Sequence, residues 1–194
     1  KKKFALISVF EKKNLKYLCS NLSIYNYNFI SSGSTGNKIR SLGFKCEDIS
    51  KITKIKEMFG GRVKTLNPLI YGSLLYIRDD ENHKKQFESL NIPEIDIVVV
   101  NLYPFKKYIK KNNINKIIEM IDIGGLSLAR AAGKNFKYIT PIIDNMDYKK
   151  LVTNLNKNNG QTDIIFRKKM AFKVFKKTAL YDKTIANWLN EKKQ

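Results

Sequence analysis

A near-continuous run of apolar, mostly β-branched residues from Ile95 to Val100 constrains the fold of this chain more than any other feature. Such a run is typical of a strand that is buried on both faces of a parallel sheet. Parallel strands are joined by long crossover connections, which are usually helices. The rest of the chain fits this scheme, because short apolar runs alternate with segments whose apolar residues recur at helical spacing. We therefore predict an α/β fold with a mainly parallel central sheet flanked by helices.

The same alternation predicts where the other elements lie. Further strands are expected over residues 4–9, 29–31, 45–49 and 138–143. Helices are expected over residues 15–22, from the loop after residue 31 toward residue 42, and over 114–121, 147–155, 162–178 and 181–189. The clearest loop is the Asn-rich stretch at 154–163. We expect one domain over 1–194, with an α/β core over 1–145 and a helical C-terminal extension over 146–194.

The formal charge of +20 raises the question of a nucleic-acid partner. Of the 37 basic residues, 32 are Lys and only five are Arg, and the lysines are spread along the whole chain. Specific base readout favours bidentate arginine. Asn and Ile are also abundant, so a bias toward A/T-rich codons accounts for the lysine content as well as function does. We expect no nucleic-acid partner, although a positive field would favour a small anionic substrate.

Cysteine, histidine and hydropathy exclude several other classes of protein. Cys19 and Cys46 are too few for a disulfide framework and are expected to be small buried hydrophobes. His83 is the single histidine and lies in a polar stretch, so no metal site is expected. No apolar run approaches the roughly 20 residues of a membrane-spanning helix. We expect a cytoplasmic protein with no membrane partner.

The first loop that follows a predicted strand is rich in hydroxyls and contains a glycine. It comprises Ser32, Gly33, Ser34 and Thr35. In open α/β sheets, ligands bind where the strands end, often at a helix N-terminus. Glycine allows close backbone approach, and the hydroxyls and helix N–H groups suit a phosphate. Ser and Thr are equally ordinary helix caps, so both interpretations stay open.

A second segment, over residues 60–68, combines glycines with basic side chains. Gly60 and Gly61 free the backbone, while Arg62 and Lys64 would project to one side of an extended chain, followed by Thr65. Arg acts on a phosphate as a fork and Lys as a point charge. Composition alone favours a solvated basic turn equally well.

A third region joins Asn101 and Tyr103, just past the Ile95–Val100 strand, with Asp122 and its two following glycines. The backbone N–H groups at the glycines would open a helix and could form a donor pair for an oxyanion. The alternative is that Asp122 is simply a helix-capping residue.

Ordered blocks along nearly the whole chain resemble the N-terminal IMP cyclohydrolase domain of the bifunctional purine biosynthesis protein that also carries AICAR transformylase. The blocks are LISVFEK, SSGST, EMFGGRVKTLNP, VVVNLYPF, IDIGG, ARAAGKN and AFKVFKKTALYD. The resemblance implies a methylglyoxal-synthase-like α/β fold with a nucleotide-binding core. It also implies dehydrative closure of the formamido-imidazole-carboxamide ribotide (FAICAR) to inosine monophosphate (IMP), without metal or organic cofactor.

The resemblance also implies which residues form the site. Those expected at the phosphate and ribose end are Lys12, Ser32, Gly33, Thr35, Arg62, Lys64 and Thr65. Those expected around the base and the closing ring are Asn101, Tyr103, Asp122, Ile123, Gly124, Gly125 and Lys134. Catalytic roles are expected for Lys64, Tyr103, Asp122 and Lys134.

One of these assignments carries a geometric condition. A continuous helix from Gly124 would place Lys134 about 15 Å further along the helix axis. Lys134 can then share the site only if the helix ends early or if the side chain reaches back from a loop.

The chain departs from the family pattern at several positions. Phe10 stands where a serine is usual, Ser34 replaces a glycine, and Asn67, Tyr71 and Lys177 stand where histidines are usual. The family protein continues into a transformylase domain that these residues do not include. Whether the chain is a stand-alone enzyme or a fragment remains open, and so does whether it forms a homodimer.

Three rival functions remain beside the cyclohydrolase. A non-catalytic nucleotide- or phosphate-binding regulatory domain of the same fold would bind the same ligand without converting it. A methylglyoxal synthase is disfavoured because its resemblance calls for a catalytic histidine pattern, and His83 stands alone. A basic nucleic-acid-binding protein would show strongly salt-dependent affinity.

Overall fold

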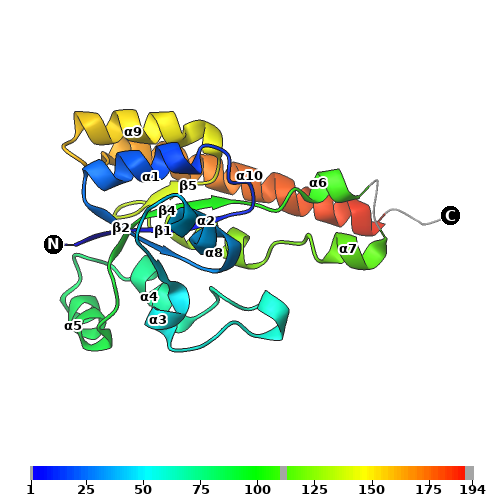
Figure 1. The fold of residues 1–194 in the computed structure, drawn as a ribbon, viewed down its shortest axis with the longest axis horizontal. Helices are drawn as coiled ribbons and strands as arrows, with labels where there is room; N and C mark the ends of the chain where they lie inside the picture. Colours follow the sequence, from blue (N-terminus) through cyan, green and yellow to red (C-terminus); the bar gives the residue numbers. More distant parts are fainter. Residues whose placement is uncertain (1, 110–112, 191–194) are drawn as a thin grey trace.

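The computed structural model describes residues 2–109 and 113–190, and its core is a parallel five-stranded sheet between two layers of helices (Figure 1). The strand order is β3-β2-β1-β4-β5, and every neighbouring pair is parallel. The strands are β1 (Lys3–Val9), β2 (Tyr27–Ser31), β3 (Cys46–Asp48), β4 (Ile95–Asn101) and β5 (Thr140–Ile142). The predicted fold class and all five strands are confirmed, with small shifts at their ends.

The apolar run that opened the prediction forms β4, which lies between β1 and β5. Ile95 and the residues 97–100 are buried, as expected for a strand covered on both faces. Asp96 interrupts the run and receives hydrogen bonds from Arg78 Nη1 at 3.1 Å and from the backbone nitrogen of Phe4 at 3.1 Å. Partners of this kind let a carboxylate sit beside a buried strand.

Helices cover both faces of the sheet (Figure 1). On one face, α1 (Leu15–Ile24), α2 (Gly33–Ser41) and α9 (Tyr148–Lys157) contribute to one apolar cluster. On the other, α3 (Ile49–Thr53), α4 (Pro68–Leu75) and α8 (Gly124–Lys134) contribute to a second. Burying apolar surface in these two clusters is the main force that holds the three layers together.

The C-terminal helix differs from the prediction. Residues 164–190 form one helix of 27 residues, α10 (Ile164–Asn190), where two helices over 162–178 and 181–189 were expected. No Gly or Pro lies between Thr178 and Tyr181, so nothing breaks the backbone there. The apolar pattern differs between the two halves of α10 because their surroundings differ. In the first half, Met170 and Val174 pack into the two core clusters, whereas the second half extends past the edge of the sheet.

Two further predictions need correction. Residues 32–35 were expected to form a loop, but α2 begins at Gly33 and Ser32 is its N-cap. The helix expected over 114–121 is shorter, because α7 (Ile114–Ile118) ends before the segment that carries Asp122. The remaining short elements are η1 (Phe59–Gly61), α5 (Glu81–Leu90), α6 (Phe105–Tyr108) and η2 (Asn145–Asp147).

Helix α4 went unpredicted, although its start is marked in the sequence. Pro68 occupies the first turn, and the side chain of Asn67 caps the helix by accepting a hydrogen bond from the backbone nitrogen of Leu69 at 2.9 Å. Asn67 therefore has a structural task of its own.

In the described residues, no helix has both the length and the apolar character needed to cross a membrane. Cys19 is buried in α1 and Cys46 is half-buried in β3, both as free thiols. Burial is the first cause that raises the pKa of the Cys19 thiol to about 12, as expected of an unreactive core residue.

Candidate active site

The carboxyl ends of the strands open into a cleft of about 680 Å³. All the expected site residues line this cleft except Lys134. They come from the ends of β1 and β4, the first turn of α2, the 60–66 segment and the start of α8. The sheet thus brings together five segments that are separated along the sequence.

The loop after β1 supplies Lys12, whose ammonium is tied to the cleft wall. Lys12 Nζ donates to the backbone oxygens of Val9 at 2.8 Å and Phe10 at 2.9 Å, and to Ser34 Oγ at 3.0 Å. Partial burial lowers the pKa of this lysine. The hydroxyl of Ser34 therefore holds Lys12 against α2.

Asn101 at the end of β4 orders the same loop. Its Oδ1 accepts hydrogen bonds from the backbone nitrogens of Phe10 at 2.6 Å and Glu11 at 3.0 Å, and its Nδ2 donates to Glu11 O at 2.8 Å. Both ends of the amide are engaged, so Asn101 shapes the cleft by fixing the β1–α1 loop.

The first turn of α2 lies beside this loop and has the features of an anion site. Ser32 makes no capping bond to the helix, and Gly33 takes a left-handed φ of 52°. Thr35 has a different task from the expected one, because its buried hydroxyl donates to Val9 O at 2.9 Å and accepts from Val9 N at 3.2 Å. Thr35 ties α2 to β1, and the N–H groups and Ser32 hydroxyl are what this turn offers a ligand.

Lys64 reaches across from the 60–66 segment to this helix end. A Cβ built on Gly33 would lie 3.3 Å from Lys64 Nζ, so the ammonium stands directly over the first residue of α2. Lys64 Nζ also pairs with Glu57 Oε2 at 3.0 Å. The segment folds back on itself through η1 and the bridge between Met58 and Val63, which lets a lysine and a helix N-terminus face the same space.

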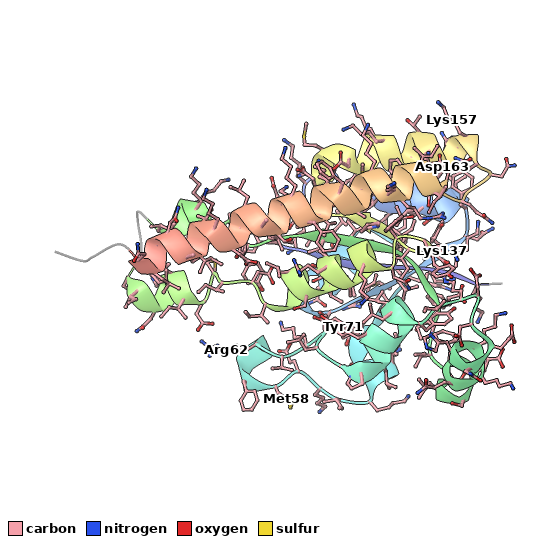
Figure 2. All side chains as sticks on the ribbon, turned by 180° about the vertical axis from the view of Figure 1, so that it is seen from behind. Met58, Arg62, Tyr71, Lys137, Lys157 and Asp163 are labelled. Atoms are coloured by element: carbon pink, nitrogen blue, oxygen red, sulfur yellow. The ribbon has the colours of Figure 1, made fainter. Side chains whose placement is uncertain are left out.

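Arg62 lies on the outer side of the same segment (Figure 2) and pairs with Glu119, just after α7. The second contact of this pair, Arg62 Nε to Glu119 Oε2, measures 3.4 Å. Both side chains are more than half exposed. The ion pair joins two segments on the mouth of the cleft, and Glu119 was not singled out in the sequence because it lies in an ordinary amphipathic stretch.

Asp122 is buried at the start of α8, and each oxygen of its carboxylate accepts a backbone hydrogen bond. Oδ1 accepts from the backbone nitrogen of Gly125 at 2.8 Å, and Oδ2 accepts from the backbone nitrogen of Tyr103 at 3.3 Å. Burial raises the pKa of Asp122, while these backbone donors oppose the rise. The helix-capping interpretation is therefore correct for this conformation, and it coexists with a place in the cleft wall.

The glycine pair after Asp122 is explained by close approach. A Cβ on Gly125 would stand 2.6 Å from Asp122 Oδ2, and a Cβ on Gly124 would stand 3.0 Å from Thr65 Oγ1. The backbone N–H groups of Gly124 and Gly125 were expected to form a donor pair for an oxyanion. In the structure, the N–H of Gly125 already donates to Asp122. Ile123 lies between these residues with an exposed side chain and also lines the cleft.

Tyr103 stands at the mouth of the cleft with 38% of its surface exposed. Its ring lies 5.3 Å from that of Phe10. Burial, followed by the charge of Asp122, raises the pKa of the Tyr103 phenol, while Lys64 opposes the rise. A phenol that shares a cleft with a carboxylate and an ammonium can take part in proton transfer.

The structure does not bring Lys134 to the cleft. Helix α8 runs without interruption from Gly124 to Lys134, so Lys134 lies at the far end of the helix, about 15 Å along the axis from Gly124. Its side chain is exposed there. The geometric condition stated for this residue is therefore not met.

Among the described residues, no group of three or more His, Cys, Asp or Glu side chains could hold a metal ion. The cleft instead combines lysines, an arginine, a helix N-terminus, one buried carboxylate and a phenol. Such a set suits an anionic substrate and proton transfer.

Known proteins are similar to this chain in sequence and in fold. A family model described as an MGS-like domain matches residues 14–127, which is more than half of the chain. The chain belongs to the MGS-like domain family. The matched residues include the cleft-lining residues from Ser32 to Gly125. A second model, described as AICARFT/IMPCHase bienzyme, matches residues 132–194.

Curated relatives of the chain are considerably longer than it. It is 42% identical over 189 residues to the bifunctional purine biosynthesis protein PurH of Persephonella marina, with 97% of this chain and 36% of the relative covered. For the PurH of Clostridium botulinum strain Hall, the identity is 45% over 190 residues, with 97% and 38% covered. The chain thus spans little more than a third of these relatives.

A solved structure has a similar fold over nearly the whole chain. The crystal structure of a protein named ForH superposes with a TM-score of 0.86 at 27% sequence identity. The superposition covers 96% of both chains.

Proposed function

We propose that this chain is an IMP cyclohydrolase, which closes the second ring of the purine base by converting FAICAR into IMP with loss of water. The observation that carries the proposal is the meeting of Asp122, Tyr103 and Lys64 in one cleft with an anion-binding wall. The name shared by the longer relatives, bifunctional purine biosynthesis protein, supports the same reaction.

The wall of the cleft suits the ribose phosphate. The N–H groups of α2, the Ser32 hydroxyl and the ammonium of Lys12 surround one end. A helix N-terminus and a lysine together favour a phosphate dianion. Arg62 joins them once the phosphate displaces Glu119 from its guanidinium.

The ring closure begins with attack of the carboxamide nitrogen of FAICAR on its own formyl carbon. Holding the two groups in contact removes much of the entropic barrier. Asp122 accepts a hydrogen bond from the amide N–H and raises the electron density of this poor nucleophile. Its environment favours this task, because burial strengthens the bond and raises the pKa of the carboxyl toward that of a useful base.

Attack places negative charge on the former formyl oxygen and leaves a proton on the nitrogen. The ammonium of Lys64 stabilises the charge, and such a contact contributes about a hundred- to thousandfold in rate. The attacking nitrogen gives up one proton to Asp122, and Tyr103 donates a proton to the oxygen, which becomes a hydroxyl. The carbon–oxygen bond then breaks as the former formamide nitrogen gives up its hydrogen to the departing hydroxide, so that water leaves and a carbon–nitrogen double bond forms. Return of the proton from Asp122 to the Tyr103 phenolate restores both groups. These roles assign no part to Lys134.

The partner domain and the cellular compartment are part of the same proposal. We take the chain to act alongside a transformylase domain, as the word bifunctional in the relatives' name suggests, and to work in the cytoplasm, where free thiols such as Cys19 and Cys46 persist. The division of the chain at residue 145 and a homodimer stay predictions.

The test is conversion of FAICAR followed by ultraviolet absorbance, with IMP confirmed by chromatography. Wild type, an Asp122→Asn variant and an enzyme-free control are compared. We expect enzyme-dependent IMP that is lost in the variant. Tight binding of the nucleotide by a folded wild type without any acceleration would overturn the proposal in favour of a non-catalytic nucleotide-binding domain.

A further inference from the structure

Tyr181 on α10 holds the backbone of the segment that carries Asp122. Its phenol oxygen accepts a hydrogen bond from the backbone nitrogen of Asp122 at 3.0 Å and donates one to the backbone oxygen of Met120 at 2.7 Å. One hydroxyl therefore satisfies a donor and an acceptor on the same turn. The phenol is half-buried and stays protonated, because burial raises its pKa to about 12.

The neighbouring segment, which carries Tyr103, rests on the same helix. Phe105 follows Tyr103 by two residues and is buried. Its ring lies 6.2 Å from the Tyr181 ring and 5.5 Å from the Trp188 ring, edge to face in both cases. Since Asp122 Oδ2 also accepts from the backbone nitrogen of Tyr103, the two segments are joined to each other as well as to α10.

The position of α10 explains why an anchor is needed here. Its first half packs against β5 and α8, but its second half runs beyond the carboxyl edge of the sheet, beside α6 and α7 (Figure 1). Past that edge, the sheet no longer supports the segments that carry Tyr103 and Asp122. The second half of α10 supplies the surface on which they are fixed.

We propose that Tyr181 is a positioning residue for the ring closure: its two backbone hydrogen bonds set the Asp122 carboxylate in the cleft. This inference rests on the proposed function. Tyr181 does not line the cleft and touches no reacting atom, so it acts only through Asp122. Misplacement of a reacting group by about 1 Å is enough to cost about a hundredfold in rate.

The first experiment replaces Tyr181 by phenylalanine, which keeps the ring against Phe105 and removes only the hydroxyl. We expect kcat for FAICAR to fall about ten- to a hundredfold, with KM within about twofold of wild type. The matched control is Tyr25→Phe, which removes a phenol that donates to Asn156 Oδ1 at 2.8 Å on the helical layer of α1 and α9, and which should leave kcat unchanged. A kcat within twofold of wild type for Tyr181→Phe would overturn the proposal.

A second readout separates this inference from the proposed function. The titration of the Asp122 carboxyl, followed by carbon NMR, needs no turnover. Loss of the anchor should let water reach the carboxyl and move its pKa down toward the ordinary range of aspartate. A shifted titration in Tyr181→Phe, together with a wild type that fails to convert FAICAR, would sustain the positioning role and reject the cyclohydrolase. An unchanged titration would reject the positioning role whatever the activity.

Aromatic packing is tested with Trp188→Phe, which alters the other ring against Phe105 and leaves both Tyr181 hydrogen bonds in place. We expect kcat and the Asp122 titration to stay close to wild type. An effect equal to that of Tyr181→Phe would assign the support to ring packing and overturn the role of the hydroxyl. Because Trp188 is the single tryptophan, its fluorescence in Tyr181→Phe also verifies that α10 still packs on Phe105.

Discussion

The side chain of Lys64 lies across Gly61 so closely that a Cβ added to the glycine would stand 2.4 Å from Lys64 Cε and 2.7 Å from Lys64 Nζ. Gly61 also has a φ of 91°, which a side chain would strain. A glycine is therefore required at position 61 for two reasons: it adopts the positive φ of the turn, and it leaves room for the Lys64 side chain to fold back over the N-terminus of α2.

Gly61→Ala should displace Lys64 and lower kcat/KM for FAICAR by about tenfold or more, since the ammonium leaves the place where the oxyanion forms. The matched control is Gly43→Ala, with a similar φ of 90° but no atom within 4 Å of the added Cβ. Both variants carry the backbone strain, and only Gly61→Ala carries the clash. Equal losses of activity in the two would refute the explanation. Steady-state kinetics and a thermal melt measure the two effects.

Thr35→Val should lower the free energy of unfolding by about 1–3 kcal/mol, because the buried backbone nitrogen of Val9 loses its acceptor. Thr35→Ser keeps the hydroxyl and should lose less. Urea unfolding of both variants gives the comparison. A loss of substrate affinity without loss of stability in Thr35→Val would instead show that the hydroxyl serves the ligand.

Glu119→Gln should lower KM for FAICAR by about two- to fivefold with kcat unchanged, because the substrate phosphate no longer competes with Glu119 for Arg62. The gain should shrink as salt is added, since both side chains are exposed. Glu81→Gln is the control, because it breaks the exposed pair with Lys84 on α5, whose Nζ–Oε1 distance is 2.6 Å. An unchanged or higher KM for Glu119→Gln would show that the pair does not compete with substrate.

The raised pKa of Asp122 predicts the acid limb of the reaction. The carboxylate is the active form, so kcat/KM should fall on acidification at a pH above the ordinary range of aspartate. Because the pKa is higher in the folded than in the unfolded chain, the stability that Asp122 contributes is present below its unfolded pKa and is lost as pH rises through the folded value. Relative to Asp122→Asn, the wild type should therefore lose unfolding free energy between these two pH values. A difference between the two proteins that is constant with pH, or an acid limb at the ordinary position, would contradict the assignment.

Local patterns were sufficient for the strands and for the edge of the sheet at which the cleft lies, whereas the individual site residues came from the family resemblance. The Ile95–Val100 run predicted β4 because continuous apolar character is what burial on both faces of a sheet requires. The small and basic residues after the strands predicted the cleft because the carboxyl ends of parallel strands meet at one edge. Those relations depend on residue type and chain order, which the sequence contains.

The failures concern relations between segments that are distant along the chain. Lys134 matched a family block, yet one uninterrupted helix carries it away from the cleft. Thr35 lines the cleft as expected, yet its hydroxyl is held by Val9 at the end of β1, a contact that no local pattern indicated. Glu119 and Tyr181 had no local signal, because their partners Arg62 and Asp122 lie 57 and 59 residues away.

The sequence by itself therefore determined the layered α/β fold and the chemical types of group that line the cleft. The tertiary structure alone decided which of those groups face the open space and which are held by neighbours. The physical reason is that a hydrogen bond or ion pair depends on distance and direction within a few ångströms, and only the packing of β1, β4, α2, α8 and α10 sets those distances.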